Sequence, residues 1–219
     1  LLTLEEKTEL FTLTAKKILC LIQDRPGTEL TFFHTAAALS RIYRFIVLHK
    51  IECGPFLFRL PEKVAFFPGT FDPFTLSHKG IVRAIRDRGF EVLLAIDEFS
   101  WSKRTLPRLL RRKIVQMSAA DQWDTYVFPD DLPINIAVGA DLAHLRALFP
   151  DRPVFLVTGS DVIRNASAYR SEAPDGAAYF PHIVIDRPQA EQREEPLEQL
   201  LHGEMRMLSL SEQMEGISS

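Results

Sequence analysis

From Lys63 onward, short runs of apolar residues alternate with longer stretches of helical periodicity, and this alternation restricts the fold more than any other feature. It is typical of strands that are each followed by a helix, which makes the strands parallel and covers the sheet with helices. Strands are expected at residues 64–67, 91–96, 125–128, 154–158, 182–186 and 205–209. Helices are expected at residues 77–88, 107–120 and 140–149. The sequence therefore predicts an α/β fold with a doubly wound parallel sheet, in which ligands bind beyond the carboxyl ends of the strands.

The first 62 residues have a different pattern, which predicts a small helical unit. Thr3 and Glu6 have the spacing of a capping box, at the start of an amphipathic stretch at residues 3–23. A second amphipathic stretch follows at residues 30–49. We expect a helical domain at residues 1–62 and an α/β domain at residues 63–219 that is cut short at its C-terminus. The N-terminal helices carry no recognisable chemistry and could mediate self-association or contact with a further domain.

Charge and composition exclude several classes of function. The formal net charge of −3 gives no general attraction to nucleic acid or to an anionic membrane, so neither is expected as a partner. The sequence has neither an apolar run of about 20 residues nor a signal peptide, so a cytoplasmic location is expected. The two cysteines, Cys20 and Cys53, lack the spacing of a zinc site, and no protein-bound metal is expected.

The segment FFPGTFDPFTLSHKG, residues 66–80, joins the first predicted strand to the first predicted helix. Gly69 would let the backbone approach a ligand closely, and the free N–H groups of the helix N-terminus favour a phosphate. Hydroxyl and imidazole groups gather around the same point, at Thr70, Thr75, Ser77 and His78. The segment therefore predicts an anion site, although an ordinary connection between strand and helix would have a similar composition.

Residues 69–78, GTFDPFTLSH, resemble the first signature of the nucleotidyltransferase superfamily, G-x-F-x-P-x-[H/T]-x-G-H. The resemblance implies that the turn binds the phosphates of a nucleotide and that His78 stabilises the α-phosphate as pyrophosphate leaves. The residues that it implicates in nucleotide binding are Gly69, Thr70, Phe71, Thr75 and Ser77. Ser77 stands where the family has glycine, so its side chain would either crowd the nucleotide or add a donor to it.

Two further segments resemble the same superfamily. Lys103 follows the second predicted strand, and Arg112 lies on the next predicted helix. In the family, a lysine and an arginine at these places assist the phosphates, and Arg111 is an alternative match for the arginine. The strand at 154–158 runs into Gly159 and Asp161, which resemble the G-x-D element of nicotinate- and nicotinamide-mononucleotide adenylyltransferases and are expected to bind nucleotide. An aspartate that only caps the next helix would give the same pattern.

The same subfamily supplies the remaining candidates. Tyr169 stands near the place of the aromatic residue that packs against the pyridine ring of the acceptor, and Arg187 begins an Arg-Pro pair after a strand. Both are expected to bind the acceptor. The last residues resemble the opening of the second signature, I-S-S-T-x-x-R, which grips the β- and γ-phosphates. Its matching residues are Ile217, Ser218 and Ser219.

These matches predict transfer of the adenylyl group of ATP to nicotinate or nicotinamide mononucleotide, with release of pyrophosphate, in NAD biosynthesis. Mg²⁺ is expected as a cofactor that arrives with ATP. The first signature, with Thr75, also resembles that of phosphopantetheine adenylyltransferases, which are therefore an alternative. Cytidylyl transfer is another alternative. Ser77 and the short second signature favour a different class, a nucleotide-binding regulatory module without catalysis.

Overall fold

The computed structural model describes residues 3, 5–6, 61–97, 105–119, 122, 124–129, 132–170, 173–186 and 196–209. The chain divides into two units, Leu1–Arg59 and Leu60–Ser219. In the first unit, the backbone N–H of Thr3 donates to Oε2 of Glu6 at 2.7 Å, and the N–H of Glu6 donates to Oγ1 of Thr3 at 3.2 Å. This confirms the predicted capping box. The rest of the predicted helices at 3–23 and 30–49 lies outside the described residues, and the separate folding of the two parts stays a prediction.

The second unit is built on a six-stranded sheet in which all paired strands are parallel. The strands are β1 (Lys63–Gly69), β2 (Phe90–Ile96), β3 (Thr125–Val127), β4 (Val154–Gly159), β5 (His182–Ile185) and β6 (Met205–Leu208). Their order is β3-β2-β1-β4-β5-β6, so the sheet grows in one direction from β1 to β3 and in the other from β4 to β6. This order confirms the predicted doubly wound α/β fold, whose ligand site lies where the direction changes, beyond β1 and β4.

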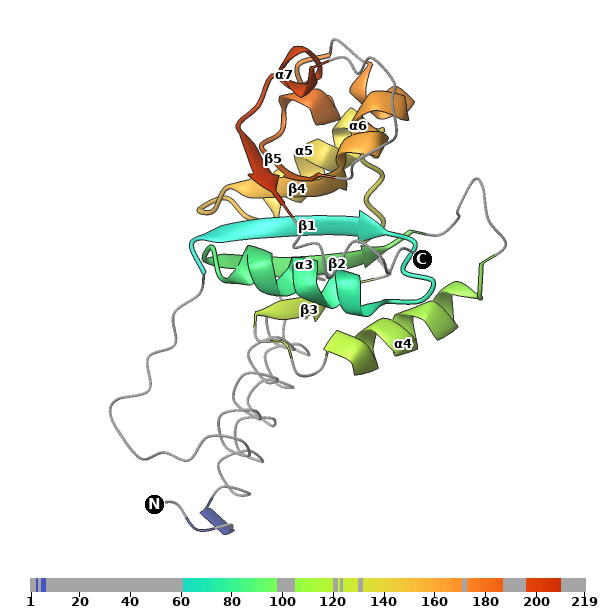
Figure 1. Cartoon of the computed structure of the whole chain (residues 1–219). Helices are drawn as coiled ribbons and strands as arrows, with labels where there is room; N and C mark the ends of the chain where they lie inside the picture. Colours follow the sequence, from blue (N-terminus) through green and yellow to red (C-terminus); the bar gives the residue numbers. More distant parts are fainter. Residues whose placement is uncertain are drawn as a thin grey trace. The chain divides into compact units, whose positions relative to one another are not determined.

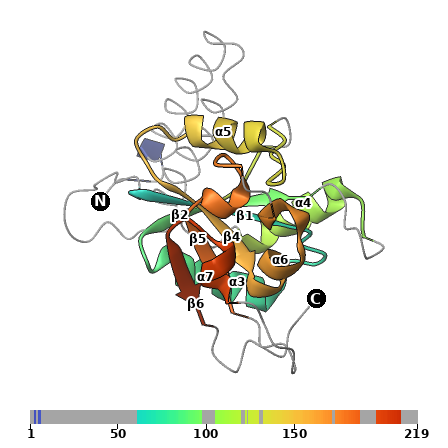
Figure 2. The ribbon, with the colours of Figure 1, turned by 90° about the horizontal axis from the view of Figure 1, so that it is seen from above.

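Helices cover both faces of the sheet. The three predicted helices are present as α3 (Leu76–Arg86), α4 (Arg108–Ala119) and α5 (Gly139–Ala147). Helices α3 and α5 lie on opposite faces, as Figure 2 shows. The short helices α6 (Ser160–Asn165) and α7 (Leu197–Leu200) were not predicted, nor were the 3-10 turns η1 (Ser167–Tyr169) and η2 (Ala177–Tyr179). Such short elements have too few residues for a helical period to be recognised.

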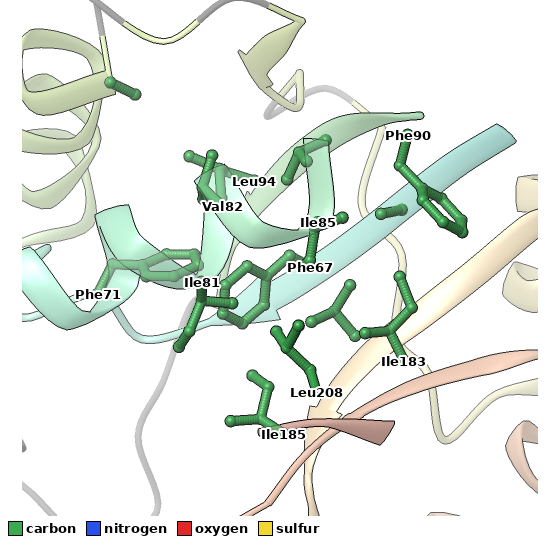
Figure 3. Packing of buried hydrophobic residues seen from close by; sticks show 14 of the residues in the cluster. Phe67, Phe71, Ile81, Val82, Ile85, Phe90, Leu94, Ile183, Ile185 and Leu208 are labelled. Carbon is green, nitrogen blue, oxygen red and sulfur yellow. The ribbon is translucent and has the colours of Figure 1, made fainter. Parts of the chain in front are cut away.

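The main core lies between the sheet and the helices α3 and α4. Helix α3 buries Ile81, Val82 and Ile85 on one side, the spacing that a helix needs to present an apolar stripe. These side chains pack against Phe67 of β1 and Phe71 of the turn that follows it, together with residues of the other strands (Figure 3). Full burial of a large apolar side chain contributes about 1.5–3 kcal/mol, so the turn is anchored to the core through Phe71.

Candidate active site

The turn between β1 and α3 lies at the carboxyl end of β1, where the arrow of that strand ends in Figure 1. Phe71 has a φ of 47°, in the left-handed region, and its ring is only 3% exposed. A Cβ atom at Gly69 would lie 3.0 Å from Cζ of that ring. Glycine at this position therefore makes room for Phe71, a reason different from the close ligand approach that the sequence suggested. The bond between Asp72 and Pro73 is cis.

Helix α3 begins with a capping box made by Thr75 and His78. The backbone N–H of Thr75 donates to Nδ1 of His78 at 3.0 Å, and Oγ1 of Thr75 lies 2.9 Å from the same nitrogen. Because Nδ1 accepts from a backbone N–H, the neutral imidazole must carry its proton on Nε2. The site therefore presents a ring N–H donor at the N-terminus of a helix, where an anion is stabilised.

Three aromatic rings fix the orientation of the His78 imidazole. The ring of Phe74 stacks on it with centroids 5.4 Å apart, and the ring of Phe71 meets it edge-on at 5.3 Å. Phe67 lies farther away, at 6.5 Å. His78 is only partly buried, so it remains within reach of a ligand while both the cap and the aromatic contacts restrain its ring.

Two polar contacts join this turn to α4 and to the segment before it. Oδ2 of Asp72 accepts from the backbone N–H of Leu106 at 2.7 Å. The guanidinium of Arg111 donates to the backbone carbonyl of Thr70 within the turn. Sequence reasoning gave no role to Asp72 and named Arg111 only as an alternative to Arg112. The position of Asp72 inside the signature was the available signal.

Arg112 points to a different place from its neighbour. Its Nη1 donates to the carbonyl oxygen of Phe128, one residue beyond β3, at 2.9 Å, and its side chain is half-buried. Arg111 is 1% exposed and faces the turn after β1. The two adjacent arginines therefore contact different strand ends. Arg111 contacts the signature turn after β1, and Arg112 contacts the residue after β3.

Asp97 follows β2 directly, and its backbone N–H donates to the carbonyl of Gly69 at 3.0 Å. Neighbouring protein atoms displace water from its carboxyl group and raise its pKa, while the positive charges of Arg111 and Arg108 oppose the rise. Although the residue as a whole is exposed, its carboxyl group is thus partly shielded from solvent. Its position at a strand end was the sequence signal that could have found it.

Gly159 and Asp161 lie at the carboxyl end of the neighbouring strand, β4. Gly159 ends β4 and is the N-cap of α6, and Asp161 lies half-buried in the first turn of that helix. Because β1 and β4 are parallel neighbours, Gly69 and Gly159 end at the same edge of the sheet. The structure therefore brings the G-x-D element to the same edge as the first signature.

Tyr169 lies in the core and not at this edge. Its ring is 3% exposed, and its hydroxyl lies 3.1 Å from Nε2 of the buried His182. A ring that stacks on a substrate needs an accessible face, so Tyr169 would have to leave the core to serve as predicted. In this structure the side chain joins η1 to β5, and its packing against an acceptor stays a prediction.

The chain was compared with protein families, with proteins of curated function and with solved structures. Residues 66–219 match the family described as Cytidylyltransferase-like. The chain belongs to this family. The match includes the turn with His78, the arginines of α4 and the G-x-D element, and it supports a role in nucleotidyl transfer. No protein of curated function is detectably similar to the chain in sequence.

Two solved structures share the fold of this cytidylyltransferase-like chain. One is the Plasmodium falciparum nicotinic acid mononucleotide adenylyltransferase complexed with NaAD, with a TM-score of 0.56 and 16% identity over 72% of this chain and 80% of that chain. The same enzyme complexed with APC gives a TM-score of 0.52, again with 16% identity and the same coverage. At this level of identity the likeness concerns the fold.

Several family positions lie outside the described residues, namely Lys103, Arg187, Ile217, Ser218 and Ser219. Within the part of the chain that the structure describes, no group of three or more His, Cys, Asp or Glu side chains could hold a metal ion. None of the helices described is long and apolar enough to cross a membrane.

Proposed function

We propose that the chain transfers the adenylyl group of ATP to nicotinate or nicotinamide mononucleotide and releases pyrophosphate, as a step in NAD biosynthesis. One observation carries the proposal: the cap at Thr75 leaves the proton of the neutral His78 imidazole on Nε2, beyond β1 and at the N-terminus of α3. A fixed donor at this place suits the α-phosphate of a nucleotide. Family membership and the fold shared with a nicotinic acid mononucleotide adenylyltransferase support the same reading.

In the proposed reaction, a phosphate oxygen of the acceptor attacks the α-phosphorus of ATP in line. The new bond forms between that oxygen and the α-phosphorus, the bond to the oxygen that bridges the α- and β-phosphates breaks, and its electron pair leaves with pyrophosphate. Such a reaction depends on positioning and charge stabilisation more than on a protein nucleophile. Nε2–H of His78 would donate to an α-phosphate oxygen, and the N–H groups that begin α3 would favour the same negative charge.

The remaining predicted residues would act on other parts of the substrates. Lys103 and Arg112 are proposed to balance the charge of the phosphates, with Ile217–Ser219 at the β- and γ-phosphates. Gly159 and Asp161 would contact the nucleotides, and Arg187 the acceptor. Mg²⁺ would enter with ATP as part of the substrate, bound by its triphosphate oxygens.

The direct test is pyrophosphate release with ATP and Mg²⁺ in the presence of nicotinate mononucleotide, nicotinamide mononucleotide or phosphopantetheine. Release with either pyridine nucleotide supports the proposal, and release with phosphopantetheine alone reassigns the acceptor. His78→Ala should lower kcat by a factor of about 100 to 1,000, the usual cost of one preorganised donor. Full turnover by this variant would remove His78 from the mechanism.

The family description favours one further candidate, cytidylyl transfer to a phosphorylated alcohol. Turnover with CTP and not with ATP would establish it. A nucleotide-binding module without catalysis is the remaining alternative, suggested by Ser77 in place of the family's glycine. Binding of ATP without pyrophosphate release, whichever acceptor is offered, would favour that reading.

A further inference from the structure

Arg111 holds together three segments that surround the signature turn. Its side chain donates to the carbonyl oxygens of Thr70, which follows β1, of Asp97, which follows β2, and of Leu106, which precedes α4. The bonds to Asp97 and Leu106 are each 2.9 Å long. We call this arrangement, made by Arg111 and the three carbonyls, the Arg111 clamp.

The clamp depends on the shape of the guanidinium and not only on its charge. A guanidinium presents five N–H donors in a rigid plane, and here Nε, Nη1 and Nη2 each reach a different carbonyl. A lysine has one nitrogen on a flexible chain and cannot reach three such divergent acceptors. Because Arg111 is 1% exposed, these carbonyls also replace the water that its charge has lost.

A short path leads from the clamp to His78. Thr70, whose carbonyl the clamp holds, precedes Phe71, and the ring of Phe71 lies edge-on to the imidazole with centroids 5.3 Å apart. Two further bonds tie the same segments, from Asp97 N–H to the Gly69 carbonyl and from Leu106 N–H to Oδ2 of Asp72. The signature turn is therefore fixed from both neighbouring segments.

We propose that Arg111 is a positioning residue: it acts through the turn to hold the His78 imidazole in place and does not itself bind the nucleotide. The inference rests on the proposed function for its effect on catalysis. Its effect on the His78 ring follows from the geometry of the turn alone. The two effects are measured separately.

The test compares Arg111→Lys and Arg111→Met with the wild-type chain and with Lys113→Met. Lys113 is an exposed cation on the same helix and serves as the matched control. We expect both Arg111 variants to lose kcat by a factor of about 100, the usual effect of misplacing a catalytic group by about 1 Å. KM for ATP should change little, and the control should behave as the wild type. Turnover is measured well below the Tm of each variant and expressed per folded molecule.

The second measurement follows the ring protons of His78 by NMR, with His78→Gln used for their assignment. In the wild type, the stacked ring of Phe74 and the edge-on ring of Phe71 should shift these protons away from their values in an unfolded chain. Both Arg111 variants should move them back toward those values. Unchanged ring shifts, or an Arg111→Lys variant that matches the wild type, would overturn the proposal.

The NMR measurement on the His78 ring also tests the positioning role of Arg111 independently of the proposed function. If the wild-type chain releases no pyrophosphate with any acceptor, the proposed function fails while the ring shifts still test the clamp. If neither Arg111 variant folds, Arg111→Gln takes their place, because its amide has one NH₂ group and can donate to at most two of the three carbonyls of the clamp. Ring shifts altered in the same direction would support the proposal, and wild-type shifts would overturn it.

Discussion

The hydroxyl of Tyr169 lies 3.1 Å from Nε2 of His182, and both side chains are buried in the second unit. Nδ1 of His182 lies 2.8 Å from the carbonyl oxygen of Phe180, which can only accept, so Nδ1 carries the ring proton and Nε2 accepts from Tyr169. Burial lowers the pKa of His182 to about 4 and raises the pKa of Tyr169 to about 12. The two groups are therefore neutral partners in the folded protein at pH 7.

His182 should make the stability of this unit fall at mildly acidic pH. An unfolded histidine has a pKa of about 6.5, so below that pH the unfolded chain binds a proton that the folded chain excludes. The free energy of unfolding should be fully retained above about pH 6.5 and decline as the pH falls toward about 4. Between pH 7 and pH 5 the loss from this residue is about 2 kcal/mol.

Urea unfolding at the two pH values measures this loss, and His182→Gln supplies the comparison because it cannot titrate. The wild type should lose about 2 kcal/mol more than the variant between pH 7 and pH 5. The same pH dependence in both proteins would mean that His182 is accessible to protons in the folded state.

Tyr169→Phe should weaken the fold without affecting the acceptor. The substitution leaves Nε2 of His182 buried without its donor, which costs about 1–3 kcal/mol. KM for nicotinate mononucleotide should stay unchanged, since the ring is covered. Tyr179→Phe is the matched control on a partly exposed tyrosine. A large rise in KM at unchanged stability would restore Tyr169 as an acceptor residue.

Glu91 and Arg152 form an ion pair at the amino edge of the sheet, opposite the candidate site. Glu91 is the second residue of β2 and is 0% exposed, and Arg152 also donates to the carbonyl of Pro61 at 3.2 Å. Glu91→Ala should cost about 3–5 kcal/mol, because it leaves a charged partner in a largely buried place. Turnover per folded molecule should not change, since the pair lies at the far end of the strands.

An exposed ion pair of the same sheet provides the control for this prediction. Oε1 of Glu204 lies 2.7 Å from Nε of Arg206, and the side chains of Glu204 and Arg206 are 52% and 36% exposed. Glu204→Ala should cost no more than about 1 kcal/mol, as for most surface pairs. Equal losses for Glu91→Ala and Glu204→Ala, measured by urea unfolding, would contradict the role given to burial.

The sequence predicted the sheet and the signature turn because both have local patterns. Apolar runs mark the strands, and glycine, proline and a capping residue mark the turn. It could not decide between Arg111 and Arg112, which differ by about 100° around the helix, because the choice depends on how α4 packs. It could not place Tyr169 either, since the hydroxyl of this residue of η1 meets His182, which comes from β5.

Gly69 tests whether the packing of Phe71 matters for catalysis. A methyl group at this position would lie 3.0 Å from the Phe71 ring, so Gly69→Ala should push the ring and, through it, the His78 imidazole. Such overpacking costs about 1–3 kcal/mol of stability, and we expect a loss of kcat per folded molecule beside it.

Gly203→Ala is the control that separates a loss of stability from a loss of kcat. Its Cβ would lie 2.1 Å from the carbonyl oxygen of Phe180, so the backbone must shift and the stability should fall by at least as much. Phe180 precedes β5 and lies away from the carboxyl ends of the strands, so turnover per folded molecule should be retained. If Phe71 links the strand end to His78, urea unfolding should show a loss of stability in both variants, and steady-state kinetics should show a loss of kcat in Gly69→Ala alone. If both variants lose stability and both keep kcat, the contact between Phe71 and His78 shapes the turn without contributing to the reaction.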